Sequence, residues 1–258
     1  MEPKKRFWIV GGSSGIGLEV VKLCLLKNYL VIASSRTATT NEELKNLKKQ
    51  FPKQLSLLDI DVSSKEDIKQ KVKLAYLIYD GLDIWFYNAA AYDVMSIDSW
   101  DIEKFEQMNE TNYLGVVRIM SNLLPYFKSK ENLKKESIKW IWNCSLSSYF
   151  GLPQGGGYSA PKAALVNLAE SIYPELELSN IKLQIINHGF VKTRLTLKNE
   201  FQMPQLMEAK DTAKKILESI ENSSSFEIRF PFGLSSFLSL LKFLPYKVSL
   251  ALTKKMLP

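Results

Sequence analysis

The chain is poor in the residues from which metal sites and disulfide-bonded folds are built. It has two cysteines, Cys24 and Cys144, and one histidine, His188, among 258 residues. Two cysteines so far apart indicate neither a disulfide framework nor a thiolate metal cluster, and a single histidine argues against a histidine-based zinc site or catalytic triad. We therefore expect no metal ion and no disulfide-rich fold.

Long hydrophobic runs are also missing. No stretch approaches the roughly 20 uninterrupted apolar residues that a membrane-spanning helix needs. The basic residues at positions 4–6 lead directly into the run Phe7-Trp8-Ile9-Val10, without the apolar region and cleavage site of a secretory signal. Together with the two unpaired cysteines, these features predict a cytoplasmic protein.

The composition is that of an ordinary globular protein. Hydrophobic residues make up 46% and charged residues 24% of the sequence, and no linker or internal repeat divides it. We therefore expect one domain over residues 1–258. The 34 basic and 27 acidic side chains give a net charge of +7. No basic run is interleaved with aromatic residues, so we expect no nucleic-acid partner.

Short apolar runs alternate with longer amphipathic stretches along the chain. The runs predict strands at residues 7–11, 30–34, 55–58, 84–88, 138–143 and 183–187, and the amphipathic stretches predict helices at residues 16–27, 41–51, 65–80, 102–128, 163–178 and 211–221. This order is typical of an α/β fold with a doubly wound, mostly parallel, Rossmann-type sheet and helices on both faces. Ligands of such folds bind beyond the carboxyl ends of the strands.

The turn after the first predicted strand is rich in glycine and leads directly into a helix. Glycine allows a tight exit from the strand at Gly11, a close approach of the backbone to a pyrophosphate at Gly15, and close packing of the helix on the sheet at Gly17. The N-terminus of the helix offers free N–H groups to phosphates. The predicted dinucleotide-binding residues of this turn are Gly11, Ser13, Ser14, Gly15, Ile16 and Gly17.

The ends of the second and third strands bear on the choice of dinucleotide. Ser35 and Arg36 follow the second strand, where NAD-binding sites usually place an acidic residue and where an arginine accommodates a 2′-phosphate. This favours NADP(H), with NAD(H) as the alternative cofactor. After the third strand, Asp61 and Val62 follow, and the Asp61 carboxylate is placed to accept from an adenine amino group or, equally, to cap the next helix.

Tyr158 and Lys162 lie four residues apart in a predicted helix, so they share one face. A free phenol has a pKa of about 10, and a nearby ammonium favours the phenolate. We expect this pair to exchange a proton with a hydroxyl or carbonyl oxygen of a substrate. The spacing by itself is frequent on ordinary exposed helices, so the interpretation depends on the other motifs.

Five motifs occur in order along the chain: Gly11/Gly15/Gly17, Asn88-Ala89-Ala90, Asn112-Tyr113-Leu114-Gly115, Asn143-Cys144-Ser145 and Tyr158/Lys162. In this order and spacing, about residues 7–228 of the chain resemble the compact single-domain branch of the short-chain dehydrogenase/reductase family. The resemblance implies an NAD(P)-dependent oxidoreductase that transfers a hydride between nicotinamide and a carbonyl or alcohol substrate.

The resemblance also implies catalytic roles. Tyr158 would be the general acid/base, and Lys162 would lower the pKa of that phenol and bind the nicotinamide ribose. Ser145, which precedes Tyr158 by 13 residues, would hydrogen-bond the substrate oxygen. Asn112 would hold a water molecule in a proton relay. Ser147 is a second candidate for this role, but Ser145 has the better spacing to Tyr158.

Further roles concern the cofactor. The resemblance implies that Asn88, with Ala89, steadies the sheet beside the dinucleotide, and that Val191 and Thr193 contact the nicotinamide carboxamide. His188 stands where the family usually has a proline, and we interpret it as a backbone substitution. Residues 194–205 would form a flexible segment over the substrate.

The last 30 residues, about 229–258, predict a basic amphipathic helical extension. Such a segment is suited to peripheral contact with an anionic membrane, or to closing over the core or a subunit interface. The resemblance further implies a homodimer or homotetramer, paired through the helices that contain Asn112 and Tyr158.

These observations predict an NADP(H)-dependent oxidoreductase that acts on an apolar carbonyl or alcohol, with Tyr158 as general acid/base. Two alternatives remain at this point. One is a non-catalytic NADP-binding sensor or scaffold protein. The other is an epimerase or dehydratase on the same fold, although such enzymes usually have a larger C-terminal substrate region.

Overall fold

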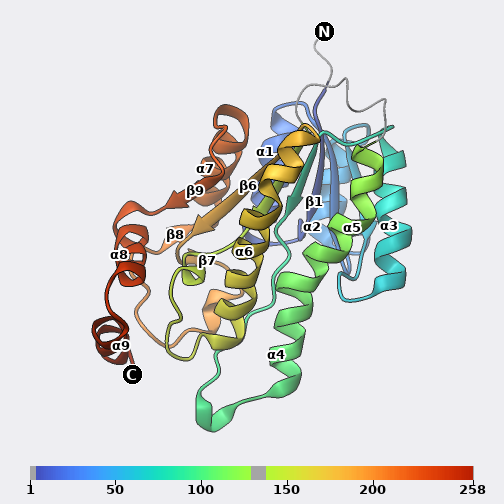
Figure 1. The fold of residues 1–258 in the computed structure, drawn as a ribbon. Coiled ribbons are helices and arrows are strands. Elements are labelled where there is room, and N and C mark those ends of the chain that lie inside the picture. Colours follow the sequence, from blue (N-terminus) through green and yellow to red (C-terminus); the bar gives the residue numbers. More distant parts are fainter. Residues whose placement is uncertain (1–3, 129–137, 258) are drawn as a thin grey trace.

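The computed structural model describes residues 4–128 and 138–257, in which seven strands form a twisted central sheet between two layers of helices (Figure 1). The strands are β1 (Arg6–Val10), β2 (Leu30–Ser35), β3 (Leu55–Asp59), β4 (Ile84–Tyr87), β5 (Ile138–Asn143), β6 (Ile181–His188) and β9 (Glu227–Phe230). They pair in parallel in the order β3-β2-β1-β4-β5-β6-β9. The strand order reverses between β1 and β4, where such sheets leave a crevice for a ligand.

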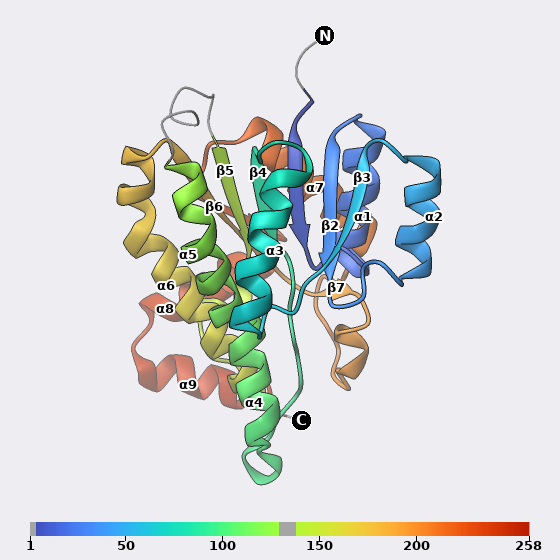
Figure 2. The same ribbon diagram turned by 90° about the vertical axis from the view of Figure 1, so that its right-hand side faces the viewer.

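Helices cover both faces of the sheet (Figures 1 and 2). One face packs on α1 (Gly15–Leu26), α2 (Glu42–Gln50) and α7 (Ala209–Asn222). The other packs on α3 (Lys65–Ile78), α5 (Gly115–Phe127) and α6 (Gly156–Leu178), and α4 (Ile102–Asn109) precedes α5. The prediction of a doubly wound, parallel α/β fold is thereby confirmed.

The central strands are apolar on both sides because helices cover both faces. Four tryptophans of β1, β4 and β5 are fully buried: Trp8, Trp85, Trp140 and Trp142. The rings of Trp85 and Trp140 meet edge to face with their centroids 5.4 Å apart. These large side chains fill the space under α3, α5 and α6, and thereby hold the carboxyl ends of β4 and β5 in place.

Four parts of the fold differ from the sequence-based prediction. Residues 102–128 form two helices joined by a π-helical turn over Glu110–Leu114. Helix α6 begins at Gly156, two residues before Tyr158, where the sequence predicts the helix to open. Strand β9 was not predicted, because only Phe230 of its four residues is buried and the strand has no apolar run. Short strands β7 (Val191–Lys192) and β8 (Met207–Glu208) form a separate two-stranded sheet.

The chain ends in helices α8 (Phe232–Phe243) and α9 (Tyr246–Lys254), which lie beyond the β9 edge of the sheet (Figure 1). Arg229 and Phe230 belong to β9, so the helical extension begins after them. Of the residues predicted to form the single domain, 1–3, 129–137 and 258 lie outside the described part of the chain. Within that described part, no helix is both long and apolar enough to span a membrane.

Candidate active site

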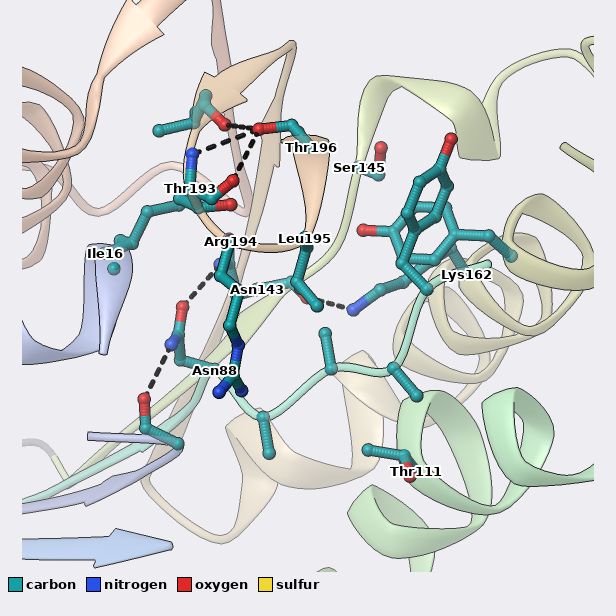
Figure 3. Close-up of a pocket in the computed structure, with 18 of the residues that line it drawn as sticks. Ile16, Asn88, Thr111, Asn143, Ser145, Lys162, Thr193, Arg194, Leu195 and Thr196 are labelled. Carbon is teal, nitrogen blue, oxygen red and sulfur yellow. Dashed lines mark hydrogen bonds between the residues drawn. The ribbon is translucent and has the colours of Figure 1, made fainter. Parts of the chain in front are cut away.

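A cavity of about 740 Å³ opens at the carboxyl ends of the central strands. Nearly all of the residues predicted from the sequence line it, although they come from segments spread over most of the chain (Figure 3). These residues are Gly11, Ser13, Ser14, Gly15, Ile16, Ser35, Arg36, Asp61, Val62, Asn88, Ala89, Ser145, Tyr158, Lys162, Val191 and Thr193. Two predicted residues, Gly17 and Asn112, do not line the cavity.

The glycine turn places the N-terminus of α1 at the cavity. Ser14, the residue that caps α1, makes no side-chain capping hydrogen bond, and the first turn of α1 contains no acidic residue. The positive end of the helix dipole therefore faces the cavity without a side chain that neutralises it. A Cβ at Gly17 would overlap the carbonyl oxygen of Gly11, so Gly17 allows α1 to pack close behind the turn.

A chain of amide hydrogen bonds joins three strands at the floor of the cavity (Figure 3). Asn143 Nδ2 donates to Asn88 Oδ1 at 2.8 Å, and Asn88 Nδ2 donates to the carbonyl oxygen of Gly11 at 2.9 Å. Lys162 Nζ donates to the carbonyl oxygen of Asn143 at 2.7 Å. The side chain of Asn88 therefore links β5 to the glycine turn.

Ser145 and Tyr158 meet beside Lys162. The Oγ atom of Ser145 accepts hydrogen bonds from the backbone N–H of Ser147 at 3.2 Å and from its hydroxyl at 3.0 Å. With both acceptor positions used, the hydroxyl hydrogen of Ser145 is available to donate. Ser147, the second candidate, thus orients Ser145 and also lines the cavity.

Burial shifts the pKa values of Tyr158 and Lys162 in opposite directions. Burial raises the pKa of Tyr158, and the hydrogen bond with Ser145 offsets part of this rise. Burial lowers the pKa of Lys162 to about 8. The sequence predicts that the ammonium lowers the phenol pKa, but here Lys162 Nζ lies 5.8 Å from the Tyr158 ring centroid and donates to Asn143. Burial therefore favours the protonated form of the phenol.

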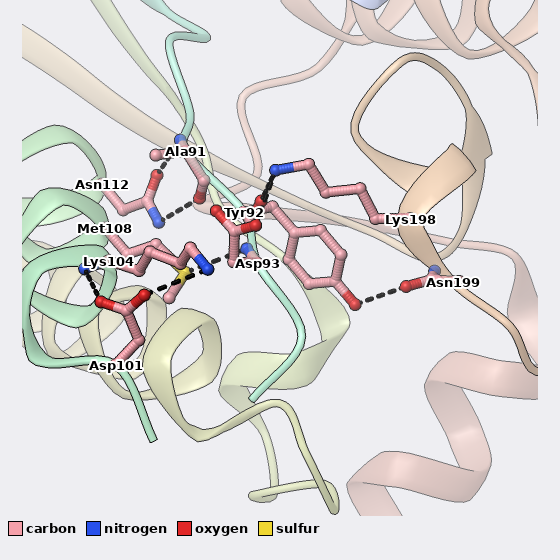
Figure 4. Close-up of polar contacts among 9 residues, drawn as sticks. All are labelled: Ala91, Tyr92, Asp93, Asp101, Lys104, Met108, Asn112, Lys198 and Asn199. Carbon is pink, nitrogen blue, oxygen red and sulfur yellow. Dashed lines mark hydrogen bonds and ion pairs between the residues drawn. The ribbon is translucent and has the colours of Figure 1, made fainter. Parts of the chain in front are cut away.

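Asn112 lies behind the cavity wall on the π-helical turn, and its side chain is fully buried. Its Oδ1 accepts from the N–H of Ala91 and its Nδ2 donates to the carbonyl oxygen of Ala91, both at 2.9 Å (Figure 4). This pair of bonds holds the loop after β4, which contributes Ala89 and Tyr92 to the cavity. These contacts position the loop, and the role of Asn112 in a proton relay stays a prediction.

At the far end of the cavity, the carboxylate of Asp61 is already engaged. Asp61 Oδ1 accepts from the N–H of Ser63 at 2.9 Å and from its hydroxyl at 2.7 Å. These hydrogen bonds, opposed by burial and assisted by the charge of Arg36, lower the pKa of Asp61. Arg36 itself is exposed at the rim, and Ser35 beside it is half-buried.

The predicted segment over the substrate, residues 194–205, is fastened to the loop after β4 (Figure 4). The hydroxyl of Tyr92 donates to Asn199 Oδ1 at 2.5 Å, and Lys198 Nζ donates to the carbonyl oxygen of Tyr92 and to Asp93, both at 2.8 Å. The Tyr92 ring also meets the Tyr158 ring edge to face at 5.1 Å. Tyr92 was not predicted, because no motif marks it.

Two further residues escaped the sequence analysis. Arg194 extends into the cavity from the start of the same segment (Figure 3). Asn187, fully buried, supports Ser145 from behind: its Oδ1 accepts from the N–H of Ser145 at 3.1 Å, and its Nδ2 donates to Glu227 at 2.6 Å. Glu227 also accepts from the hydroxyl of Tyr149. Only the pairing of β6 with β9 brings this carboxylate to Asn187.

His188 lines the cavity as a neutral ring. Burial lowers its pKa to about 4, and its Nδ1 lies 2.7 Å from the carbonyl oxygen of Gly189. Within residues 4–128 and 138–257, no cluster of histidine, cysteine and acidic side chains could hold a metal ion. The cavity lining offers hydroxyl, amide, ammonium, guanidinium and carboxylate groups.

One end of the cavity is apolar. Leu146 and Leu152 from the loop after β5 cluster there with Leu234 and Leu238 of α8, and Phe201 of the segment over the cavity also lines it. Nothing in the sequence of α8 marks it as part of the cavity, since its apolar residues also fit simple core packing.

Comparisons with known proteins agree with this geometry. A model of the family described as short chain dehydrogenase matches residues 5–203. A Bacillus subtilis (strain 168) protein, "Uncharacterized oxidoreductase YusZ", is 30% identical over 230 residues, which cover 85% of this chain and 78% of that protein.

Solved structures show the same fold. A short-chain dehydrogenase from Streptomyces avermitilis superposes with a TM-score of 0.81 at 20% identity, covering 98% of each chain. A short chain dehydrogenase from Burkholderia cenocepacia in complex with NADP superposes with a TM-score of 0.80 at 18% identity, covering 99% of this chain and 98% of that one. From its sequence match over most of its length and from this fold, the chain belongs to the short-chain dehydrogenase family of oxidoreductases.

Proposed function

We propose that this oxidoreductase uses NADP(H) to interconvert an apolar carbonyl compound and the corresponding alcohol, with Tyr158 as the general acid/base. One observation carries the proposal. Ser145, Tyr158 and Lys162 converge in the cavity that the N-terminus of α1 also enters. A proton donor and a dinucleotide-binding surface therefore share one space.

The residues present fit the dinucleotide. The first turn of α1 has N–H groups that no capping side chain engages, which suits a pyrophosphate. Arg36, exposed at the far rim beyond Asp61, suits the additional phosphate of NADP(H). Val191 and Thr193 line the nicotinamide end of the cavity in this proposal. When bound there, the cofactor supplies or accepts the hydride.

The protein's own groups supply the proton. In the reducing direction the protonated phenol of Tyr158 donates to the carbonyl oxygen as negative charge develops on it. The hydroxyl of Ser145, oriented by Ser147, donates a second hydrogen bond to the same oxygen. Lys162 stays protonated below its pKa of about 8 and provides positive charge near the phenol.

The apolar end of the cavity indicates the substrate class. Leu152, Phe201 and Leu238 offer no hydrogen bond to a substrate, so this end favours a hydrocarbon portion next to the reacting carbonyl. We therefore propose an apolar aldehyde or ketone, or its alcohol.

Replacing Tyr158 with phenylalanine tests the proposal. Tyr158→Phe removes the proton donor and leaves the ring, so we expect turnover with carbonyl substrates to fall about 100- to 10,000-fold. Binding of NADPH, followed by fluorescence titration, should change little. Undiminished turnover would contradict the role of Tyr158. Binding of NADPH by the wild type without turnover across a broad carbonyl panel would favour a sensor or scaffold instead.

We also propose that the protein forms a homodimer or homotetramer in the cytoplasm. The half-buried residues Ala163, Ala164 and Leu168 on α6 support a pairing surface of small and apolar side chains. The free, buried thiols of Cys24 and Cys144 are consistent with a reducing compartment. Light scattering coupled to size-exclusion chromatography measures the subunit number, and a monomer at micromolar concentration would contradict the assembly.

A further inference from the structure

The C-terminal helices α8 and α9 present an apolar surface outward. On α8, Leu238 and Leu241 are buried against Leu146, whereas Phe232 is 82% exposed and Phe243 is 84% exposed. A helix that serves only the core of its own domain needs one apolar face. Helix α8 has apolar side chains on both sides, and the outer ones have no partner within the described chain that buries them.

Helix α9 buries two hydroxyl residues and exposes several apolar ones, although Leu252 packs against the cluster that contains Leu238 and Leu241. It turns the hydroxyl residues Ser249 and Thr253 inward, where they are 0% and 5% exposed, and leaves Tyr246 77% exposed and Leu250 56% exposed. The Ser249 hydroxyl donates to the carbonyl oxygen of Leu241 at 2.8 Å, which docks α9 on α8. On a surface that faces water, we would expect the hydroxyl side chains outside and the apolar ones inside. The observed pattern therefore fits a helix whose outer side meets an apolar environment.

The charge of the same segment has one sign. After Glu227 the chain contains no further acidic residue, and the lysines of the segment are exposed. We call the following residues the tail surface: Phe232, Phe237, Leu240, Phe243, Tyr246, Val248, Leu250, Met256 and Leu257, with Lys242, Lys247, Lys254 and Lys255. Apolar side chains mixed with lysines match the boundary between acyl chains and anionic headgroups of a membrane.

We propose that the tail surface binds the surface of membranes that contain anionic lipids. Charge complementarity selects this occupant over a second copy of the chain. Two tail surfaces facing each other about a twofold axis would bring lysines against lysines without an acidic residue from either tail. An anionic bilayer offers negative headgroups that attract the lysines and an apolar layer that buries the exposed apolar side chains.

The tail surface lies next to the candidate active site. Leu234 and Leu238 of α8 line the apolar end of the cavity, while Leu240 and Phe243 of the same helix belong to the tail surface. A protein bound to a membrane by this surface would hold the apolar end of its cavity close to the lipid. The consequence, which rests on the proposed function, is a substrate that partitions into membranes, such as a long-chain aldehyde or ketone.

Cosedimentation of the full-length protein with vesicles tests the proposal. We expect binding to vesicles of phosphatidylcholine and phosphatidylserine, weaker binding to pure phosphatidylcholine, and a decrease with rising salt. Lys254→Gln combined with Lys255→Gln should lower the partition coefficient about tenfold or more. Phe243→Ser combined with Leu250→Ser should lower it by a similar factor, because both side chains are removed from the apolar layer.

Matched control variants show whether loss of binding is specific to the tail surface or follows from removing any exposed lysine or apolar side chain. Lys69→Gln with Lys73→Gln removes two exposed lysines of α3, and Leu178→Ser removes a side chain that is 90% exposed at the end of α6. These variants should bind vesicles like the wild type. Equal losses in the controls would overturn the proposal, as would wild-type protein that stays in the supernatant with anionic vesicles.

Two further readouts distinguish the remaining outcomes. If light scattering shows that Phe243→Ser with Leu250→Ser converts an oligomer into monomers, the tail surface is an interface between copies and the proposal is wrong. Titration with NADPH, and turnover with a water-soluble carbonyl substrate, should be unchanged in the tail variants. Cofactor binding and turnover of the wild type therefore test the proposed function, and vesicle binding tests the membrane proposal independently.

Discussion

At the scale of single residues, Lys162 shows how the proposed site conflicts with stability. Its side chain is 2% exposed, and burial lowers its pKa to about 8. Below that pH the folded protein carries a buried ammonium whose main hydrogen bond is to the carbonyl oxygen of Asn143. Such a group stabilises a bound anion or phenolate more than it stabilises the empty fold.

We predict that Lys162→Met raises stability and abolishes activity. At pH 7 the variant loses a buried charge and one hydrogen bond, so the free energy of unfolding without cofactor should rise by about 1–3 kcal/mol. Chemical denaturation measures this change, and turnover should fall at least about 100-fold. A variant that is both active and less stable than the wild type would contradict this account.

The pH dependence of that difference follows from the pKa shift. Between the folded pKa of about 8 and the unfolded value of 10.5, the unfolded chain binds a proton at Lys162 that the folded chain does not. The contribution of Lys162 to the free energy of unfolding therefore rises with pH in this window. The difference in the free energy of unfolding between Lys162→Met and the wild type should therefore become smaller as the pH increases from 7 to 9.

At the scale of elements, α8 connects the end of the chain to the loop that carries Ser145. Leu238 and Leu241 pack against Leu146 and Tyr149, which come one and four residues after Ser145. The loop therefore depends on a helix more than 80 residues away in the sequence. We infer that α8 supports the geometry of the site as well as forming its apolar wall.

A pair of substitutions on α8 tests this inference. Leu238 is 3% exposed and Leu240 is 53% exposed, although they are two residues apart. Leu238→Ala should lower the free energy of unfolding by about 2–4 kcal/mol and reduce turnover. Leu240→Ala should change stability by less than about 0.5 kcal/mol. Similar losses of stability in both variants would show that α8 does not pack as described.

At the scale of the whole molecule, ligand binding and stability are linked. A dinucleotide that binds only the folded protein, at about 100 times its dissociation constant, adds roughly 2.7 kcal/mol of stability. For a chain of this length, that corresponds to a rise in the thermal midpoint of about 5–10 °C. We predict such a rise with NADPH and a smaller one with NADH at the same concentration.

Arg36 provides the control for this measurement. Arg36→Gln should reduce the midpoint shift with NADPH toward that with NADH, because only NADPH carries the 2′-phosphate. The shift with NADH should stay as in the wild type. Lys69→Gln, which removes one exposed positive charge on α3, should leave both shifts unchanged. Equal shifts for both dinucleotides in the wild type would contradict the proposed preference for NADP(H).

The α/β fold could be predicted because most of its strands are buried on both faces and therefore consist of continuous apolar residues. Strand β9 could not be predicted, because it lies at the sheet edge and buries mainly Phe230. The π-helical turn between α4 and α5 was also not predicted. A π-helical turn changes the hydrogen-bonding pattern without interrupting the amphipathic sequence.

The order of β1 to β6 and the residues that follow these strands could be read from local periodicity and glycine spacing, because both are properties of neighbouring residues. Tertiary structure alone decided that Asn112 acts on Ala91, that Asn187 joins Ser145 to Glu227, and that α8 closes one end of the cavity. It also set the pKa values of Tyr158 and Lys162. The physical reason is that these contacts and the burial behind the shifts join distant segments, which only the packing of helices on the sheet brings together.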